Sequence, residues 1–233
     1  MRRFDGACPV CGNKTFSMLW AIPKELVGEW RLSEEESAYI SRQQGFTCCS
    51  CRNNLRAMAL AAAVLSEFGF CGTLDQFCDA SRRLDVLEIN EAANLAPFLG
   101  KMHGHRLIEY PQIDMLNITF AAESFDLIIH SDTLEHVADP LKGLAECYRV
   151  LRSGGRCVFT VPTILGRMTR SRAGLPNSYH GDPEEKAENQ RVHTEFGADV
   201  WKMALEAGFL SCKIFCFEYP AGLALIAQKT LAD

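Results

Sequence analysis

The sequence predicts an α/β fold, in which a doubly wound and mostly parallel sheet follows a small cysteine-rich unit. Three observations predict this fold. From residue 84 onward, short apolar segments alternate with amphipathic ones, as in parallel sheets with right-handed crossovers. The last two apolar segments are joined by a short turn, which favours an antiparallel pair. Two cysteine pairs within the first 52 residues indicate a separate N-terminal unit.

The composition narrows the class of protein. The chain has 233 residues, of which 48% are hydrophobic and 23% are charged, which suits one α/β domain with a small appendage. The net charge is −5 and the acidic excess lies beyond residue 56, so charge disfavours a nucleic-acid partner. No apolar run is long enough to cross a membrane, and no apolar signal segment precedes Cys8. We therefore expect a cytoplasmic protein without a membrane partner.

The N-terminal helices are indicated by the residues at their ends. Ser33 precedes three glutamates, which is typical of a helix N-terminus. The stretch 53–68 is rich in Ala, Leu and Met and stops at Gly69, and residues 72–83 predict a shorter helix. We divide the chain into a zinc-binding module at 1–52, connecting helices at 53–83 and the main domain at 84–233.

In the main domain, apolar runs predict strands and the segments between them predict helices. The predicted strands are 84–89, 105–109, 125–130, 156–161, 212–218 and 223–229. The predicted helices are 91–100, 140–151 and 196–207. The second of these is supported by Asp139 as an N-cap and Pro140 in the first turn. We expect residues 162–196 to form an insertion that covers a substrate.

Two cysteine pairs have the spacing of zinc ligands. Cys8 and Cys11 form one C-x2-C pair, and Cys48 and Cys51 form the other. Eleven cysteines in a reducing compartment favour metal ligation and buried thiols over disulfides. Four thiolates satisfy the tetrahedral preference of a structural zinc, so we predict a zinc site at these residues. Cys49 is the alternative to Cys48.

Residues 125–162 carry the most specific motif, FDLIIHSDTLEHVADPLKGLAECYRVLRSGGRCVFTVP. The segment resembles the central part of class I S-adenosylmethionine-dependent methyltransferases that act on small molecules, and the flanking elements extend the resemblance over about 84–230. The resemblance implies a seven-strand-type sheet with a final antiparallel pair, and S-adenosylmethionine as cofactor. It says almost nothing about the substrate.

Polar side chains follow the predicted strands, where ligands of open α/β sheets bind. A carboxylate after the second strand can accept hydrogen bonds from both ribose hydroxyls, which makes Glu109 a candidate. The resemblance places Asp114 near the adenine amino group and Met115 beside the ring. The full set of predicted cofactor residues is Glu88, Asn90, Glu109, Asp114, Met115, His130 and Ser131.

The chain departs from that family after the first strand. The family has a glycine-rich turn there, whereas this sequence has no glycine from Glu88 to Asn94. Asn tolerates a left-handed backbone and Ala is small, so Asn90 and the pair Ala92-Ala93 are expected to replace the glycines in part. The stretch between the second strand and Asp114 is also too short for the usual helix.

Histidines are the candidate proton acceptors for methyl transfer. The resemblance places His136 near the methionine end of the cofactor, and the insertion adds His180 and His193. Asp132, Glu135 and His136 also have a helical spacing that suits a divalent metal, and they resemble the E-x-x-E-H motif of some oxygen-directed methyltransferases.

The insertion carries Arg167, Arg170 and Arg172, which suit an anionic or hydroxyl-rich acceptor such as a saccharide or sugar-nucleotide precursor. The sequence therefore predicts an enzyme that methylates a small molecule of this class. Two alternatives stay open. One is an RNA methyltransferase that uses the zinc module as a grip. The other is a non-catalytic scaffold that retains the fold without the glycine turn.

Overall fold

The computed structural model describes residues 6–81, 83–179 and 188–230. Its main sheet has six strands in the order β10-β11-β6-β5-β3-β4. The four strands from β4 to β6 are parallel, while β11 pairs antiparallel with both β6 and β10. Their bounds are β3 Asp85–Ile89, β4 Gly104–Ile108, β5 Phe125–Ser131, β6 Leu151–Thr160, β10 Ser211–Glu218 and β11 Gly222–Gln228.

The final antiparallel pair is thus confirmed, but the seven-strand expectation is wrong for the described residues. In the sequence, the missing strand would fall between β4 and β5, where residues 109–124 form only turns and irregular segments. That connection is too short for a crossover helix, a strand and their turns, because a parallel crossover needs a dozen or more residues before the next strand begins.

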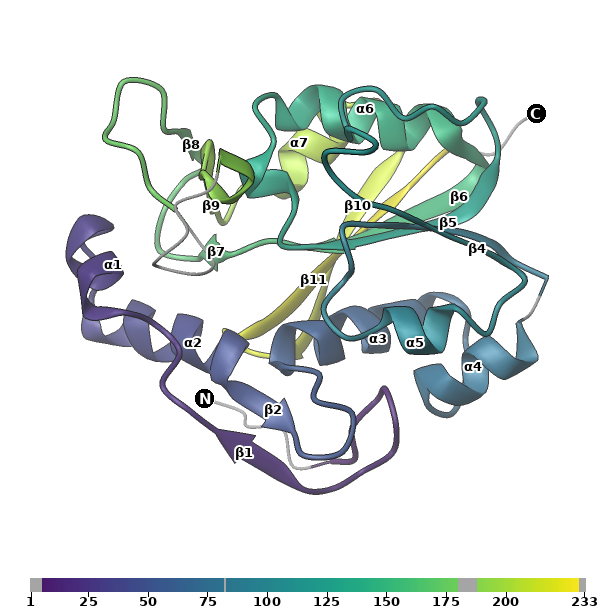
Figure 1. Ribbon diagram of the computed structural model, residues 1–233, viewed down its shortest axis with the longest axis horizontal. Coiled ribbons are helices and arrows are strands. Elements are labelled where there is room, and N and C mark those ends of the chain that lie inside the picture. Colours follow the sequence, from purple (N-terminus) through teal and green to yellow (C-terminus); the bar gives the residue numbers. More distant parts are fainter. Residues whose placement is uncertain (1–5, 82, 180–187, 231–233) are drawn as a thin grey trace.

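Helices cover both faces of the sheet (Figure 1). On one face lie α3 (Leu55–Glu67), α4 (Leu74–Ala80) and α5 (Ala96–Leu99), and on the other lie α6 (Pro140–Val150) and α7 (Trp201–Glu206). The two faces use alternate residues of each strand. In β5, for example, Leu127 and Ile129 join the core under α3, while Ile128 joins the core under α6.

The N-terminal unit packs beneath the α3 face (Figure 1). It contains the antiparallel strands β1 (Phe16–Met18) and β2 (Phe46–Cys48), and the helices α1 (Lys24–Glu29) and α2 (Glu34–Gly45). Ser33 begins α2 as expected, because its hydroxyl accepts from the Glu36 N–H while the Glu36 carboxylate accepts from the Ser33 N–H. Within the described residues, no helix is long and apolar enough to cross a membrane.

The insertion forms a second, small sheet with the order β7-β9-β8. Its strands are β7 (Thr163–Ile164), β8 (Arg170–Ser171) and β9 (Thr194–Gly197), and a 3-10 turn, η2, covers Glu188–Gln190. The predicted helix over 196–207 is therefore wrong at its start. β9 pairs with strands more than 20 residues earlier in the chain, and no local periodicity reports such a partner.

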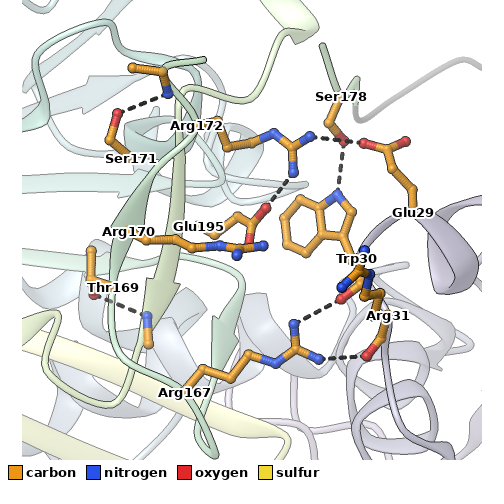
Figure 2. A network of polar contacts seen from close by, with 12 residues as sticks. Glu29, Trp30, Arg31, Arg167, Thr169, Arg170, Ser171, Arg172, Ser178 and Glu195 are labelled. Carbon is orange, nitrogen blue, oxygen red and sulfur yellow. Dashed lines mark hydrogen bonds and ion pairs between the residues drawn. The ribbon is translucent and has the colours of Figure 1, made fainter. Parts of the chain in front are cut away.

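Two arginines fasten the insertion to the N-terminal helices (Figure 2). Arg167 binds the carboxylate of Glu36 through Nε (2.9 Å) and Nη2 (2.7 Å), and it donates to the carbonyl oxygens of Trp30 and Arg31 at 2.8 Å each. Arg172 pairs with Glu195 on β9 and contacts Glu29 at 3.2 Å. These bonds hold α1 and α2 against the small sheet.

Candidate active site

A cavity of about 540 Å³ opens at the carboxyl ends of β3, β4 and β5. The chain order reverses here, because β4 lies on one side of β3 and β5 on the other. Such a switch point is where open α/β sheets bind ligands. We call this cavity the switch-point pocket. The predicted residues that line it are Asn90, Glu109, Asp114, Met115, His136 and His193.

The loop after β3 makes a tight turn without glycine. Asn90, Glu91 and Ala93 have positive φ angles of 52°, 31° and 56°. The Asn90 side chain accepts from the Tyr110 N–H at 2.8 Å and so ties this loop to the end of β4. Glu88 is fully buried beneath the loop, where its carboxylate accepts from the Ala92 N–H at 2.8 Å. Glu88 therefore supports the loop and does not line the pocket.

The far side of the pocket comes from the connection between β4 and β5. Glu109 and Asp114 are exposed there, and Asp114 accepts from the Leu116 N–H at 2.8 Å, which fixes the turn. Met115 is 3% exposed and packs against Gly143 of α6. This side of the pocket thus contributes the carboxylates of Glu109 and Asp114 and the side chain of Met115.

His130 and Ser131 lie below the pocket and do not line it, which corrects their expected contact with the cofactor. His130 is fully buried and stacks on Phe159 with 4.9 Å between ring centroids. This burial lowers the pKa of His130 to about 3, so the ring is neutral. The Ser131 hydroxyl hydrogen-bonds to the Thr160 hydroxyl at 2.7 Å. Each side chain contacts its neighbour on β6, because His130 is in register with Phe159 and Ser131 with Thr160.

A buried charged cluster adjoins the pocket at Asp132. This residue has a φ of 51° and forms an ion pair with Arg56 of α3, whose side chain is 2% exposed. Gln43 also accepts from Arg56 at 3.0 Å. Glu135 is buried nearby, where desolvation raises its pKa to about 7 although the Arg56 charge lowers it. Burial in turn lowers the pKa of Arg56 to about 10.

This cluster contradicts the divalent-metal hypothesis. Leu134–His136 is a single 3-10 turn, η1, so Asp132, Glu135 and His136 do not share one face of an α-helix. Arg56 takes the Asp132 carboxylate as its partner instead. Among the described residues, the three do not form a group whose ligand atoms could surround one ion.

The candidate histidines His136 and His193 differ in their hydrogen-bond partners, and burial lowers the pKa of both. The ring of His136 contacts the Arg191 carbonyl oxygen through Nδ1 at 3.0 Å, and burial lowers its pKa. His193 donates its backbone N–H to the Glu135 carbonyl at 2.7 Å, and partial burial lowers the pKa of its side chain. Both rings are therefore neutral at pH 7 and able to accept a proton. His180 lies outside the described residues.

The N-terminal unit brings four cysteines together. The Sγ atoms of Cys8 and Cys51 are 3.7 Å apart, as are those of Cys11 and Cys48. Tetrahedral zinc with Zn–S bonds of about 2.3 Å separates its sulfurs by about 3.8 Å. Asn13 donates to the Cys48 sulfur at 3.5 Å, which suits a thiolate. Cys49 is exposed and outside the group, so the geometry favours Cys48.

Arg56 is a buried charged residue of the site that was not among the residues predicted from the sequence. A signal was available, since Arg56 is the one charged residue in the otherwise apolar run from Leu55 to Leu65. A buried charge requires a partner, and that partner, Asp132, follows a strand end 76 positions later. The pattern alone could not identify it.

Comparison with known proteins agrees with the motif. Residues 69–159 match a family described as "Methyltransferase domain". A demethylmenaquinone methyltransferase of Mycobacterium sp. (strain KMS) is 34% identical over 100 residues, covering 35% of this chain and 44% of that protein. A ubiquinone biosynthesis O-methyltransferase of Cereibacter sphaeroides is 31% identical over 77 residues, which cover 32% of this chain and 31% of that protein. The chain thus spans less than half the length of these curated relatives.

Among solved structures, a 1,6-didemethyltoxoflavin-N1-methyltransferase of Burkholderia thailandensis, with S-adenosylhomocysteine bound, aligns over 92% of this chain and 95% of its own. Its identity is 18% and its TM-score is 0.44. The family match over 69–159 includes most of the motif at 125–162. Residues 69–159 are therefore similar to the methyltransferase domain family.

Proposed function

We propose that this protein transfers a methyl group from S-adenosylmethionine to a small-molecule acceptor. The observation that carries the proposal is the switch-point pocket, which gathers Asn90, Glu109, Asp114 and Met115 at the strand ends. A volume of about 540 Å³ lies within the usual range of small-molecule and cofactor sites. The two exposed carboxylates and the buried thioether fit a nucleoside.

In this proposal each pocket residue has a chemical task. Glu109 accepts hydrogen bonds from the ribose hydroxyls, Asp114 accepts from the adenine amino group, and Met115 packs on the adenine face. S-adenosylmethionine held by these residues would supply an electrophilic methyl carbon to the acceptor. His193, neutral and at the pocket, is the base that would take a proton released by the acceptor.

The structure changes the case for an anionic acceptor. Arg167 is bound to Glu36 and two carbonyl oxygens, and Arg170 and Arg172 are both paired with Glu195. These arginines stabilise the insertion, so they no longer support an anionic acceptor. A hydroxyl-bearing acceptor remains compatible with the neutral His193 at the pocket. The curated relatives are named for demethylmenaquinone methylation and for ubiquinone biosynthesis.

We also propose that Cys8, Cys11, Cys48 and Cys51 bind a structural zinc ion. The sulfur spacing supports a tetrahedral site, and four thiolates leave no open position for a substrate. The site would join the C-terminal end of β2, through Cys48 and Cys51, to the segment before β1, and so would stabilise the N-terminal unit.

Calorimetric titration with S-adenosylhomocysteine tests the main proposal. We expect micromolar binding to the zinc-loaded protein, and at least a tenfold weaker Kd for Glu109→Ala and Asp114→Ala. Glu206→Ala is the control, since Glu206 is exposed on α7 and does not line the pocket. A folded protein that fails to bind the cofactor product at millimolar concentration would refute the proposal.

A further inference from the structure

A second cavity of about 810 Å³ lies between the N-terminal helices and the insertion. We call it the N-terminal pocket. Most of its wall is apolar, and its polar side chains include Arg56 on one side and Tyr179 on another. The apolar residues that line it include Leu26, Trp30, Ile40 and Ile164.

The N-terminal pocket and the switch-point pocket meet at one ion pair. Arg56 lines the N-terminal pocket, and its partner Asp132 lines the switch-point pocket. Methyl transfer requires the acceptor atom to lie within about 3–3.5 Å of the donor carbon. A molecule in the N-terminal pocket that reaches the Arg56–Asp132 pair would extend toward the bound cofactor.

The wall of the N-terminal pocket is held rigidly. The Trp30 side chain is 4% exposed and donates from Nε1 to the Ser178 hydroxyl at 2.8 Å (Figure 2). The Arg172 guanidinium lies 5.8 Å from the centroid of the Trp30 ring. Because Arg167 also binds the Trp30 carbonyl, both the backbone and the ring of this residue are fixed before a ligand enters.

The charges around Arg56 discriminate between ligands. Its positive charge already faces Asp132 and Glu135, and the pocket wall includes the further carboxylates of Glu25 and Glu29. An additional anion would meet net negative charge. Yet the buried Nε–H of Arg56 has no hydrogen-bond partner among the described residues. An unmet buried donor favours a ligand that supplies an acceptor atom without a charge.

We propose that the N-terminal pocket binds the methyl acceptor, a neutral and mainly apolar molecule that presents a carbonyl or hydroxyl oxygen to Arg56. The role of this ligand as methyl acceptor rests on the proposed function. Its chemical class rests on the N-terminal pocket alone. It also gives the N-terminal unit a role, because residues 21–40 supply most of the apolar wall.

The test uses 2-naphthol as a neutral hydroxyl probe and 2-naphthoate as its charged counterpart. Each is titrated by calorimetry into the full zinc-loaded chain. We expect 2-naphthol to bind with a submillimolar Kd and 2-naphthoate to bind at least tenfold more weakly. Leu26→Trp adds bulk to the apolar wall of the pocket, and we expect it to weaken 2-naphthol binding at least tenfold. Leu205→Trp, at a site on α7 that is 40% exposed, is the matched control.

Three results would overturn the inference: no 2-naphthol binding up to its solubility limit, tighter binding of 2-naphthoate, or equal binding to Leu26→Trp and the wild type. S-adenosylhomocysteine is titrated into the same samples to separate the two proposals. If it binds all variants equally while 2-naphthol does not bind, only the acceptor inference fails. If it fails to bind the wild type, methyl transfer fails, and the 2-naphthol result still decides whether the pocket takes this ligand class.

Discussion

Gly143 in α6 supports Met115, and replacing it with alanine should weaken cofactor binding without unfolding the protein. A Cβ atom at this position would lie 3.3 Å from the Met115 Sδ and 3.4 Å from its Cγ. Both distances are shorter than comfortable carbon–sulfur and carbon–carbon contacts, which begin near 3.5 Å. The methionine would have to move by a few tenths of an ångström, and it lines the switch-point pocket.

The expected magnitudes follow from two opposing terms. Alanine in a helix interior stabilises by about 0.5–1 kcal/mol relative to glycine. Overpacking a core contact costs about 1–3 kcal/mol, and the flexible Met115 side chain places this case at the low end. The two terms nearly cancel, so we expect a Tm within about 4 °C of the wild type, which corresponds to a net change below about 1 kcal/mol.

Cofactor affinity should change more than stability. If the displaced Met115 side chain intrudes on the adenine site, the Kd for S-adenosylhomocysteine should rise about three- to tenfold, or about 0.7–1.4 kcal/mol. Calorimetry measures this Kd, and thermal unfolding measures stability on the same sample. Gly28→Ala in α1 is the matched control, since a Cβ there meets nothing within 4 Å. Unchanged affinity in Gly143→Ala, with a higher Tm in both variants, would refute the placement of Met115 beside the cofactor.

Three further predictions concern the zinc unit, the insertion and the loop after β3. Cys51→Ser should lose the bound zinc and lower the Tm, whereas Cys49→Ser should retain one zinc per chain by atomic absorption; equal zinc content would contradict the four-cysteine site. Arg167 lowers the pKa of Glu36, so their pair stabilises the fold above the unfolded pKa of about 4.3, and this contribution is lost as pH falls through the lower folded value. Urea unfolding should show Glu36→Gln destabilised at pH 7 and much closer to the wild type at pH 3, and a gap of equal size at both pH values would argue against the pair. Ala93→Gly should stabilise by about 1 kcal/mol, because Ala93 has a φ of 56° that glycine adopts without strain; a lower Tm would contradict this.

Local signals in the sequence predicted most of the main domain. Asp139 does cap α6, since its carboxylate accepts from the Lys142 N–H, and Pro140 does occupy the first turn. The expected left-handed backbone at Asn90 is present as well. These features depend on a few adjacent residues, which is why their patterns were sufficient.

Long-range partners account for what the sequence did not predict. The arginines of the insertion read as ligands for an anion, but Arg167 pairs with Glu36, 131 positions away. His130 is the last residue of the expected strand, yet the sheet directs it toward Phe159 and away from the pocket. The helix predicted from residue 196 gave way to β9, whose partners are β7 and β8. Composition and periodicity do not specify which distant side chain a charge or a strand will meet.

The central claim is that the cofactor occupies the switch-point pocket. A crystal structure of the zinc-loaded protein with S-adenosylhomocysteine would test this claim most directly. The account predicts the adenine against Met115, the ribose hydroxyls within hydrogen-bond distance of Glu109, and the sulfur on the side of the pocket formed by Asp132. Electron density for the cofactor product in the N-terminal pocket, or at any site that leaves Glu109 and Met115 without contact, would contradict it.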